Sequence, residues 1–188
     1  MAKCFIVIVN FLFSLVTYGQ VSDAYSKCRT DLKQFISDIR QSELSTGQII
    51  LVNQPISLAT ETVLFYAARN RDVFTSLDTG FIARQIDAYK NFQWDTTIVD
   101  SARIVSQSTV DTIFKNSKEG SGWERFTKLY GREELYHLSL PIFTLDKNYC
   151  IVEIHRSCGS LCGTYCVVVF KRHGKQWKRF KELECSVS

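Results

Sequence analysis

The stretch YCIVEIHRSCGSLCGTYCVVVFKR, residues 149–172, decides the fold class of this 188-residue chain. Its two ends, 149–156 and 165–172, are rich in β-branched and aromatic residues. The segment between them, 157–163, is made mostly of small residues. Because so short a connection joins neighbouring antiparallel strands, we predict a β-hairpin here.

Two further segments extend this hairpin into a sheet. Residues 135–144 and 176–183 also have a period near two, and turn residues at 146–148 and 173–174 separate them from the hairpin strands. Four strands joined by short turns form a meander. We therefore predict a four-stranded antiparallel β-meander at the C-terminal end of the chain.

The first half of the chain differs in period. Apolar residues recur at helical spacing in four segments, 23–40, 81–89, 108–118 and 121–130, with Ser22, Ser108 and Ser121 as expected N-caps and Gly131 as a helix stop. Short strands are predicted at 48–52 and 102–106, and 61–68 fits either a strand or a helix. Helices first and strands last indicate an α+β fold rather than alternating βαβ units.

The hairpin has an expected register, given by three cross-strand pairs: Arg156 with Thr164, Ile154 with Cys166, and Cys150 with Phe170. In this register Cys150 and Cys166 share a sheet face but lie four residues apart, about 13 Å along the strand. A disulfide needs Cα atoms within about 7 Å. We therefore expect Cys150 and Cys166 not to be bonded to each other.

A disulfide is expected at the hairpin connection instead. Cys158 and Cys162 flank three residues that must reverse the chain, so their Cα atoms approach each other, and Gly159 and Gly163 permit a turn with positive φ. The partners of Cys28, Cys150, Cys166 and Cys185 stay open at this stage.

The N-terminus has the pattern of a cleavable signal peptide. Lys3 precedes an uncharged apolar run, 4–16, and Thr17 and Gly19 put slim or small residues three and one positions before the expected cut. The run is too short for a membrane span. We expect residues 1–19 to be removed before Gln20, which leaves 20–188 as one globular, secreted or periplasmic domain without a transmembrane anchor.

Residues 122–183 also carry an ordered set of motifs: Gly122-Trp123 with Phe126, Leu138-Ser139 with Pro141 and Phe143, Cys158-Gly159-Ser160-Leu161-Cys162-Gly163, and Gly174-Lys175 with Trp177-Lys178. In this the chain resembles a family of uncharacterised exported bacterial proteins of the Bacteroidota type. That family usually has a small residue near position 150 and more glycine after the second Cys-Gly, where Cys150, Thr164 and Tyr165 stand here. The resemblance implies fold and export, and no established activity.

The hairpin also carries the candidate chemistry. Glu153 and His155 share a strand face, and Cys158 follows closely, so a nucleophilic thiol with a histidine base is one hypothesis. Structural zinc sites use Cys-x2-Cys knuckles, which are missing from this segment, so we expect no metal and no cofactor. The alternative is a recognition loop closed by Cys158–Cys162, whose binding residues would be Ser157, Ser160, Leu161 and Tyr165.

Residues 171–181 are the basic part of the chain, with six cations interleaved with Trp177 and Phe180: Lys171, Arg172, Lys175, Lys178, Arg179 and Lys181. Such a pattern can bind nucleic acid. The formal net charge of only +4 favours a soluble hairpin edge instead, so we expect no nucleic-acid binding.

Two functional hypotheses remain. The first is a non-catalytic exported module that binds a protein or a cell-envelope component. The second is a hydrolase-type enzyme with its site around Glu153, His155 and the Cys158–Cys162 loop. Phosphate-binding loops and the common zinc and serine hydrolase motifs are absent from the sequence, which favours the first.

Overall fold

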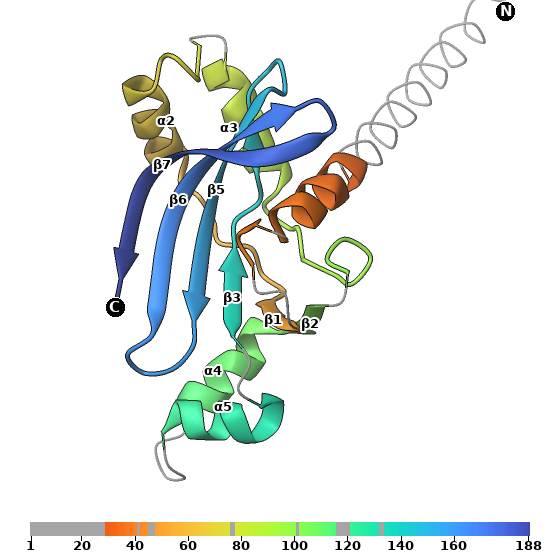
Figure 1. The fold of residues 1–188 in the computed structure, drawn as a ribbon, viewed down its shortest axis with the longest axis vertical. Helices are drawn as coiled ribbons and strands as arrows, with labels where there is room; N and C mark the ends of the chain where they lie inside the picture. Colours follow the sequence, from red (N-terminus) through yellow and green to blue (C-terminus); the bar gives the residue numbers. More distant parts are fainter. Residues whose placement is uncertain are drawn as a thin grey trace, which may run out of the picture.

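The computed structural model of this chain describes residues 29–40, 42–44, 48–75, 78–100, 102–115, 121–131 and 134–188. The predicted signal peptide, its cleavage site, Ser22 and Cys28 lie outside these residues. The described part combines helices with one mixed sheet, so the predicted α+β fold is confirmed (Figure 1). None of the described helices is long and apolar enough to cross a membrane.

The sheet has seven strands in the order β2-β1-β3-β5-β6-β7, and β4 pairs with β5 beside this path. Their bounds are β1 (Ile49–Val52), β2 (Ala102–Val105), β3 (Leu135–Leu138), β4 (Ile142–Phe143), β5 (Tyr149–Ser157), β6 (Gly163–His173) and β7 (Gln176–Val187). Strands β3, β5, β6 and β7 pair with one another in this order, each pair antiparallel, as the predicted meander requires. All three predicted pairs between β5 and β6 occur in the structure.

The predicted strand 135–144 is wrong as a single strand. It is divided into β3 and β4, with Ser139, Leu140 and Pro141 between them. Pro141 has no backbone N–H to donate to a strand ladder, so the pairing is interrupted there.

The N-terminal strands join the same sheet in parallel. β1 lies between β2 and β3 and is parallel to both. The connection from β1 to β2 contains α2 (Thr60–Arg69) and α3 (Asp78–Ala88), and that from β2 to β3 contains α4 (Gln107–Lys115) and α5 (Gly122–Tyr130). Helix α2 covers the segment 61–68 that the sequence left ambiguous. The parallel pairing depends on contacts between distant segments, which the local pattern does not contain.

Helix caps explain two of the boundaries. Ser121 and Glu124 form a capping box at the start of α5, and Gly131 ends that helix with φ of 83°. The predicted cap Ser108 is wrong, because α4 already begins at Gln107 and the Ser106 hydroxyl accepts the bond from the backbone N–H of Thr109 at 3.1 Å.

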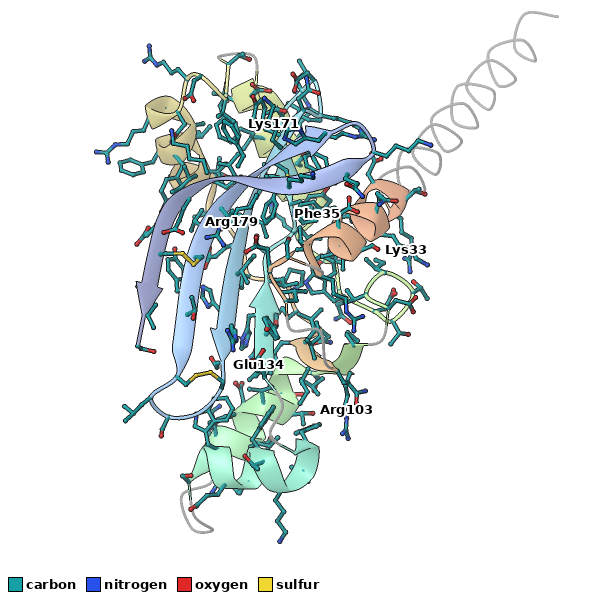
Figure 2. All side chains as sticks on the ribbon, viewed as in Figure 1. Lys33, Phe35, Arg103, Glu134, Lys171 and Arg179 are labelled. Atoms are coloured by element: carbon teal, nitrogen blue, oxygen red, sulfur yellow. A yellow bond between two sulfur atoms is a disulfide. The ribbon has the colours of Figure 1, made fainter. Side chains whose placement is uncertain are left out.

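The two faces of the sheet are covered differently (Figure 1). One face packs against the helix of residues 29–40, whose Phe35 points toward the sheet and lies 5.3 Å from the ring of Phe170 (Figure 2). On the other face, α2 and α3 cover one end through Ile151, Val167 and Val169, and α4 and α5 cover the opposite end. A stretch of β5, β6 and β7 lies between these two helix pairs.

Candidate functional site

The stretch between the helix pairs carries the predicted residues Glu153 and His155. Both project from β5 to the same face, since strand side chains alternate. His155 Nε2 lies 2.6 Å from Glu153 Oε1, with side chains 37% and 12% exposed respectively. Among the described residues, Glu153 is the only hydrogen-bond partner of the His155 ring. The Glu153 carboxylate therefore fixes the orientation of the His155 ring, and the ring is partly exposed to solvent.

A row of rings crosses the strands at His155. His137 on β3 and Tyr165 on β6 are its cross-strand partners. The ring centroids lie 6.4 Å apart for His137–His155 and 4.8 Å apart for His155–Tyr165. Burial lowers the pKa of His137, and the neighbouring His155 lowers it further. His137 is therefore held in its neutral form more strongly than an exposed histidine.

A second carboxylate stands on the far side of β6 from Glu153. Glu184 on β7 is paired with Val167 of β6, which in turn is paired with Glu153 of β5. The hydroxyl of Tyr66 on α2 donates a hydrogen bond to Glu184.

The two tyrosines of this region are kept protonated. Burial raises the pKa of Tyr66, and its bond to Glu184 adds to the effect. Burial also raises the pKa of Tyr165, with a further contribution from the charges of Glu153 and Glu184. We name this group the acidic–aromatic cluster: Tyr66, His137, Glu153, His155, Tyr165 and Glu184.

Sequence reasoning identified half of this cluster, namely Glu153, His155 and Tyr165. His137 could have been found by extending the hairpin register to β3, which places it opposite His155. Glu184 was missed because the predicted last strand stopped at residue 183, whereas β7 continues to Val187. Nothing in the local sequence signals that Tyr66 on a helix reaches the same face.

The catalytic hypothesis for Cys158 is not supported. Cys158 and Cys162 form the predicted disulfide, with Cα atoms 5.1 Å apart, so neither of these two sulfurs is a thiol that could attack a substrate or bind zinc (Figure 2). Moreover, no Ser, Thr or Tyr hydroxyl of the described residues forms a hydrogen bond with the His155 ring. Within the described part of the chain, the Glu153–His155 pair therefore has no hydroxyl or thiol side chain hydrogen-bonded to its histidine ring that could serve as the nucleophile.

The loop closed by this disulfide is an exposed tip. The backbone N–H of Cys158 donates to the carbonyl of Cys162 at 2.8 Å, and Gly159 has φ of 140°. Gly163 does not have the expected positive φ, because it belongs to β6 and pairs with Ser188 through both backbone groups. Leu161 is 90% exposed at the tip and Ser160 is also exposed, while Ser157 is half-buried at the end of β5.

The remaining described cysteines are also placed. Cys166 and Cys185 form a second disulfide between β6 and β7, with Cα atoms 4.2 Å apart, and Cys150 is a buried free thiol. Of the described residues, Cys166, Glu182 and Cys185 come together as potential metal ligands, but the disulfide occupies both sulfurs.

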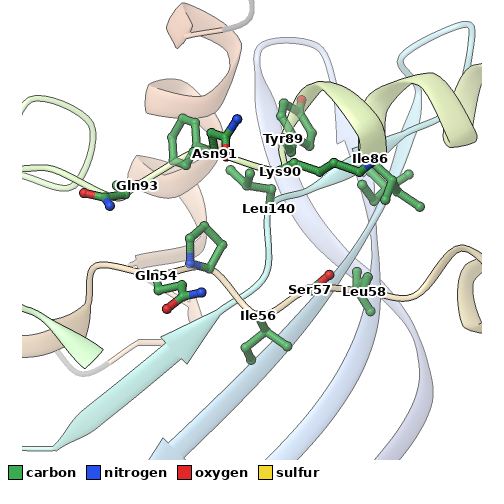
Figure 3. A pocket seen from close by; sticks show the side chains of 13 residues that line it. Gln54, Ile56, Ser57, Leu58, Ile86, Tyr89, Lys90, Asn91, Gln93 and Leu140 are labelled. Carbon is green, nitrogen blue, oxygen red and sulfur yellow. The ribbon is translucent and has the colours of Figure 1, made fainter. Parts of the chain in front are cut away.

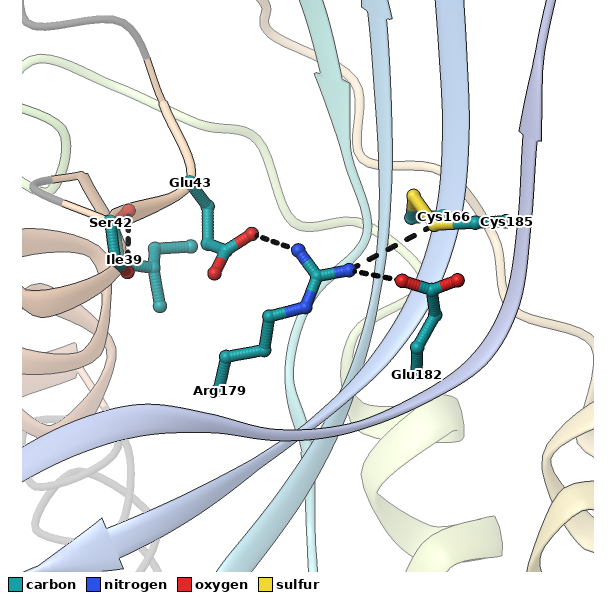
Figure 4. Close-up of polar contacts among 7 residues, drawn as sticks. All are labelled: Ile39, Ser42, Glu43, Cys166, Arg179, Glu182 and Cys185. Atoms are coloured by element: carbon teal, nitrogen blue, oxygen red, sulfur yellow. Dashed lines mark hydrogen bonds and ion pairs between the residues drawn. A yellow bond between two sulfur atoms is a disulfide. The ribbon is translucent and has the colours of Figure 1, made fainter.

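Two bulges in β7 shape the surroundings of the second disulfide, which Figure 4 shows beside Arg179 and Glu182. The register of β7 shifts twice against β6, and these shifts place three residues of β7 on the face of the 29–40 helix: Arg179, Glu182 and Cys185. In a regular strand, residues three positions apart would face opposite sides. Arg179 donates to Glu43 at 2.6 Å and to Glu182 at 2.7 Å.

Several cations of the basic segment have partners within the protein. Arg179 is ion-paired as described, Lys171 lies over the rings of Tyr149 and Phe180, and Arg172 lies over Trp177. These contacts fit a hairpin edge packed on itself. The expected lack of nucleic-acid binding stays a prediction.

Comparison with known proteins gives no relative: no protein family, curated protein or solved structure matches the chain.

Proposed function

We propose that the protein is an exported, non-catalytic binding module that holds a basic segment of a partner protein on the acidic–aromatic cluster. The observation that carries this proposal is the placement of Glu153 and Glu184 on either side of one strand. They project to the same face from β5 and β7, two strand spacings or about 10 Å apart. The whole chain carries a formal charge of +4, so this cluster is an acidic site on a basic protein.

The cluster has the chemistry that a lysine or arginine side chain requires. A cation above β6 would lie between the two carboxylates and beside the ring of Tyr165. Charge-assisted hydrogen bonds to carboxylates are about twice as strong as neutral ones, and an aromatic ring adds a cation–π contribution. Tyr66 already donates to Glu184 and so holds this carboxylate in place before the ligand arrives.

The exposed loop supports a protein partner in preference to a free small cation. Leu161 stands at the tip of the same β5–β6 hairpin that carries Glu153 and Tyr165. Interfaces often depend on a few anchoring side chains, and a disulfide reduces the entropy lost when a loop is ordered. A segment of partner long enough to contact both the cluster and Leu161 would use Ser157 and Ser160 as additional polar contacts.

The two disulfides support the proposed location. Disulfides persist in oxidising compartments such as the periplasm and the extracellular space. Together with the predicted signal peptide 1–19, they favour a secreted or periplasmic protein. The resemblance of residues 122–183 to exported bacterial proteins agrees with this location and adds no activity.

The experiment uses a labelled peptide with three lysines spaced by Gly and Ala, and a matched peptide with glutamate at the same positions. We expect the lysine peptide to bind more tightly, and to shift the NMR signals of Tyr165 and its neighbours on β6. In the variant Glu153→Gln/Glu184→Gln, its affinity should fall at least about tenfold, which corresponds to 1.4 kcal/mol. The control Glu61→Gln removes one exposed carboxylate from α2 and should leave the affinity within about twofold.

Two outcomes would contradict the proposal. One is equal affinity for the lysine and glutamate peptides. The other is unchanged binding of the lysine peptide to Glu153→Gln/Glu184→Gln while this variant retains its thermal unfolding midpoint, since binding would then occur elsewhere on the protein.

A further inference from the structure

A cavity of about 490 Å³ lies at the carboxyl ends of the parallel strands β1 and β3 (Figure 3). Three parts of the chain line it: residues 54–58 after β1, Ile86 with residues 89–93 at the end of α3, and Leu140 with Ile142 after β3. It shares no residue with the acidic–aromatic cluster. Ligands commonly bind at the carboxyl ends of parallel strands, and this volume is within the usual range for small-molecule sites.

Backbone hydrogen bonds fix the walls of this cavity. The N–H of Ile56 donates to the carbonyl of Leu138 at 3.0 Å, which attaches the segment after β1 to the end of β3. The N–H of Trp94 donates to the carbonyl of Asn53 at 2.8 Å, and the Trp94 indole donates to the carbonyl of Leu138. The two walls are therefore joined at their base, and the space between them exists before a ligand binds.

The polar groups of the cavity are neutral hydrogen-bonding groups. Three carboxamides line it, on Gln54, Asn91 and Gln93, together with the hydroxyl of Ser57, and all four residues are exposed. Figure 3 shows Ser57 on one wall and Asn91 on the wall opposite. None of the described residues forms a hydrogen bond with the three carboxamides. Because each carboxamide both donates and accepts, neighbouring hydroxyl groups on one ligand are well suited to it.

The charge of the cavity is low. None of the lining residues is acidic, and its single lining cation, Lys90, forms an ion pair with Asp87 at 2.5 Å. An anionic ligand would have to compete with Asp87 for this cation, and a cationic ligand would find no carboxylate in the lining.

Apolar side chains form the rest of the cavity lining. Ile56 contributes partly exposed aliphatic surface, Leu58, Leu140 and Ile142 are almost fully buried residues of the lining, and the half-buried rings of Tyr89 and Phe92 lie in the segment after α3. We infer that this cavity binds a neutral sugar, whose hydroxyl groups would pair with the carboxamides while its C–H face packs on the apolar wall. This site is separate from the proposed basic-peptide site and does not depend on it.

The test is NMR titration of the side-chain amide signals of the full chain with neutral mono- and disaccharides: glucose, N-acetylglucosamine and maltose. Glucose 6-phosphate and a capped neutral dipeptide are the comparison ligands. We expect at least one neutral sugar to shift the amide signals of Gln54, Asn91 and Gln93. In Gln54→Leu/Asn91→Leu its affinity should fall at least about tenfold. The matched control Gln176→Leu, at the exposed start of β7, should bind as the unchanged protein does.

Three outcomes would overturn the inference. In the first, none of the three sugars shifts these signals at millimolar concentration. In the second, glucose 6-phosphate or the dipeptide binds more tightly than every neutral sugar. In the third, a sugar binds with unchanged affinity to Gln54→Leu/Asn91→Leu, whose folding is checked by its thermal unfolding midpoint.

Discussion

Arg179 of β7 and Glu43, which follows the 29–40 helix, form an ion pair across 136 residues of sequence, with 2.6 Å between Nη1 and Oε2. The Glu43 side chain is only 10% exposed, and burial raises its pKa although Arg179 acts in the opposite direction. The pair connects the helix on one face of the sheet to the bulged edge strand (Figure 4).

Replacing Arg179 should destabilise the protein through this pair. In Arg179→Met, Glu43 would keep most of its burial and lose its cation, and we expect a loss of about 1–2 kcal/mol in the free energy of unfolding, measured with urea. The double variant Glu43→Gln/Arg179→Met should lose less than Arg179→Met alone. The neighbouring exposed Lys178→Met is the control, and an equal loss in this variant would contradict a specific role for Arg179.

The two disulfides should contribute unequally to stability. Cys166 and Cys185 are 19 residues apart, whereas Cys158 and Cys162 are only 4 apart. Because a longer closed loop restricts the unfolded chain more, Cys166→Ala/Cys185→Ala should cost about 3 kcal/mol and Cys158→Ala/Cys162→Ala below about 2 kcal/mol. Urea unfolding of the two double variants measures both losses, and the reverse order would contradict this account.

His137 should make stability depend on pH in a defined window. Its folded-state pKa is lowered below the ordinary 6.5, so below about pH 6.5 the unfolded chain binds more protons at this residue than the folded chain does. Stability should therefore fall as the pH falls through 6.5 toward the lowered pKa. In His137→Gln this part of the pH dependence should disappear, whereas His173→Gln, at an exposed turn, should retain it. The free energy of unfolding of the unchanged protein and of both variants, measured with urea at several pH values, tests this.

Cys150 should be an unreactive thiol in the native protein. It is fully buried between the sheet and the 29–40 helix, and burial raises the pKa of its thiol well above the ordinary value. In a variant with Cys4 and Cys28 changed to Ser, a thiol reagent should modify Cys150 only after the protein is unfolded under non-reducing conditions. Rapid modification of the folded protein would contradict the buried position.

The proposed exported location predicts the start of the mature chain. Thr17 and Gly19, three and one positions before Gln20, follow an apolar run of signal-peptide length. Mass spectrometry of the exported protein should therefore give a chain that begins at Gln20. A chain that retains residues 1–19 would contradict the prediction.

By itself, the sequence determined the local features of this protein. The β-branched and aromatic residues of 149–156 and 165–172, joined by a short connection, determined the β5–β6 hairpin, and the expected register with Arg156 opposite Thr164 occurs in the structure. The spacing of three residues between Cys158 and Cys162 determined the loop and its disulfide, since chain reversal over so few residues brings the two Cα atoms together. Alternation placed Glu153 and His155 on one face, whereas Tyr165 was expected only as a binding residue of the adjoining loop.

Only the tertiary structure decided the rest. The parallel pairing of β1 with β2 and β3 joins segments that helices separate, and a local pattern carries no information about which distant strands meet. The bulges of β7 changed the faces of Arg179, Glu182 and Cys185, and so decided the second disulfide and the ion pair with Glu43. Tyr66 reached Glu184 only because α2 packs on β5 and β6. Such contacts arise from packing between elements, whose energy depends on residues far apart in the chain.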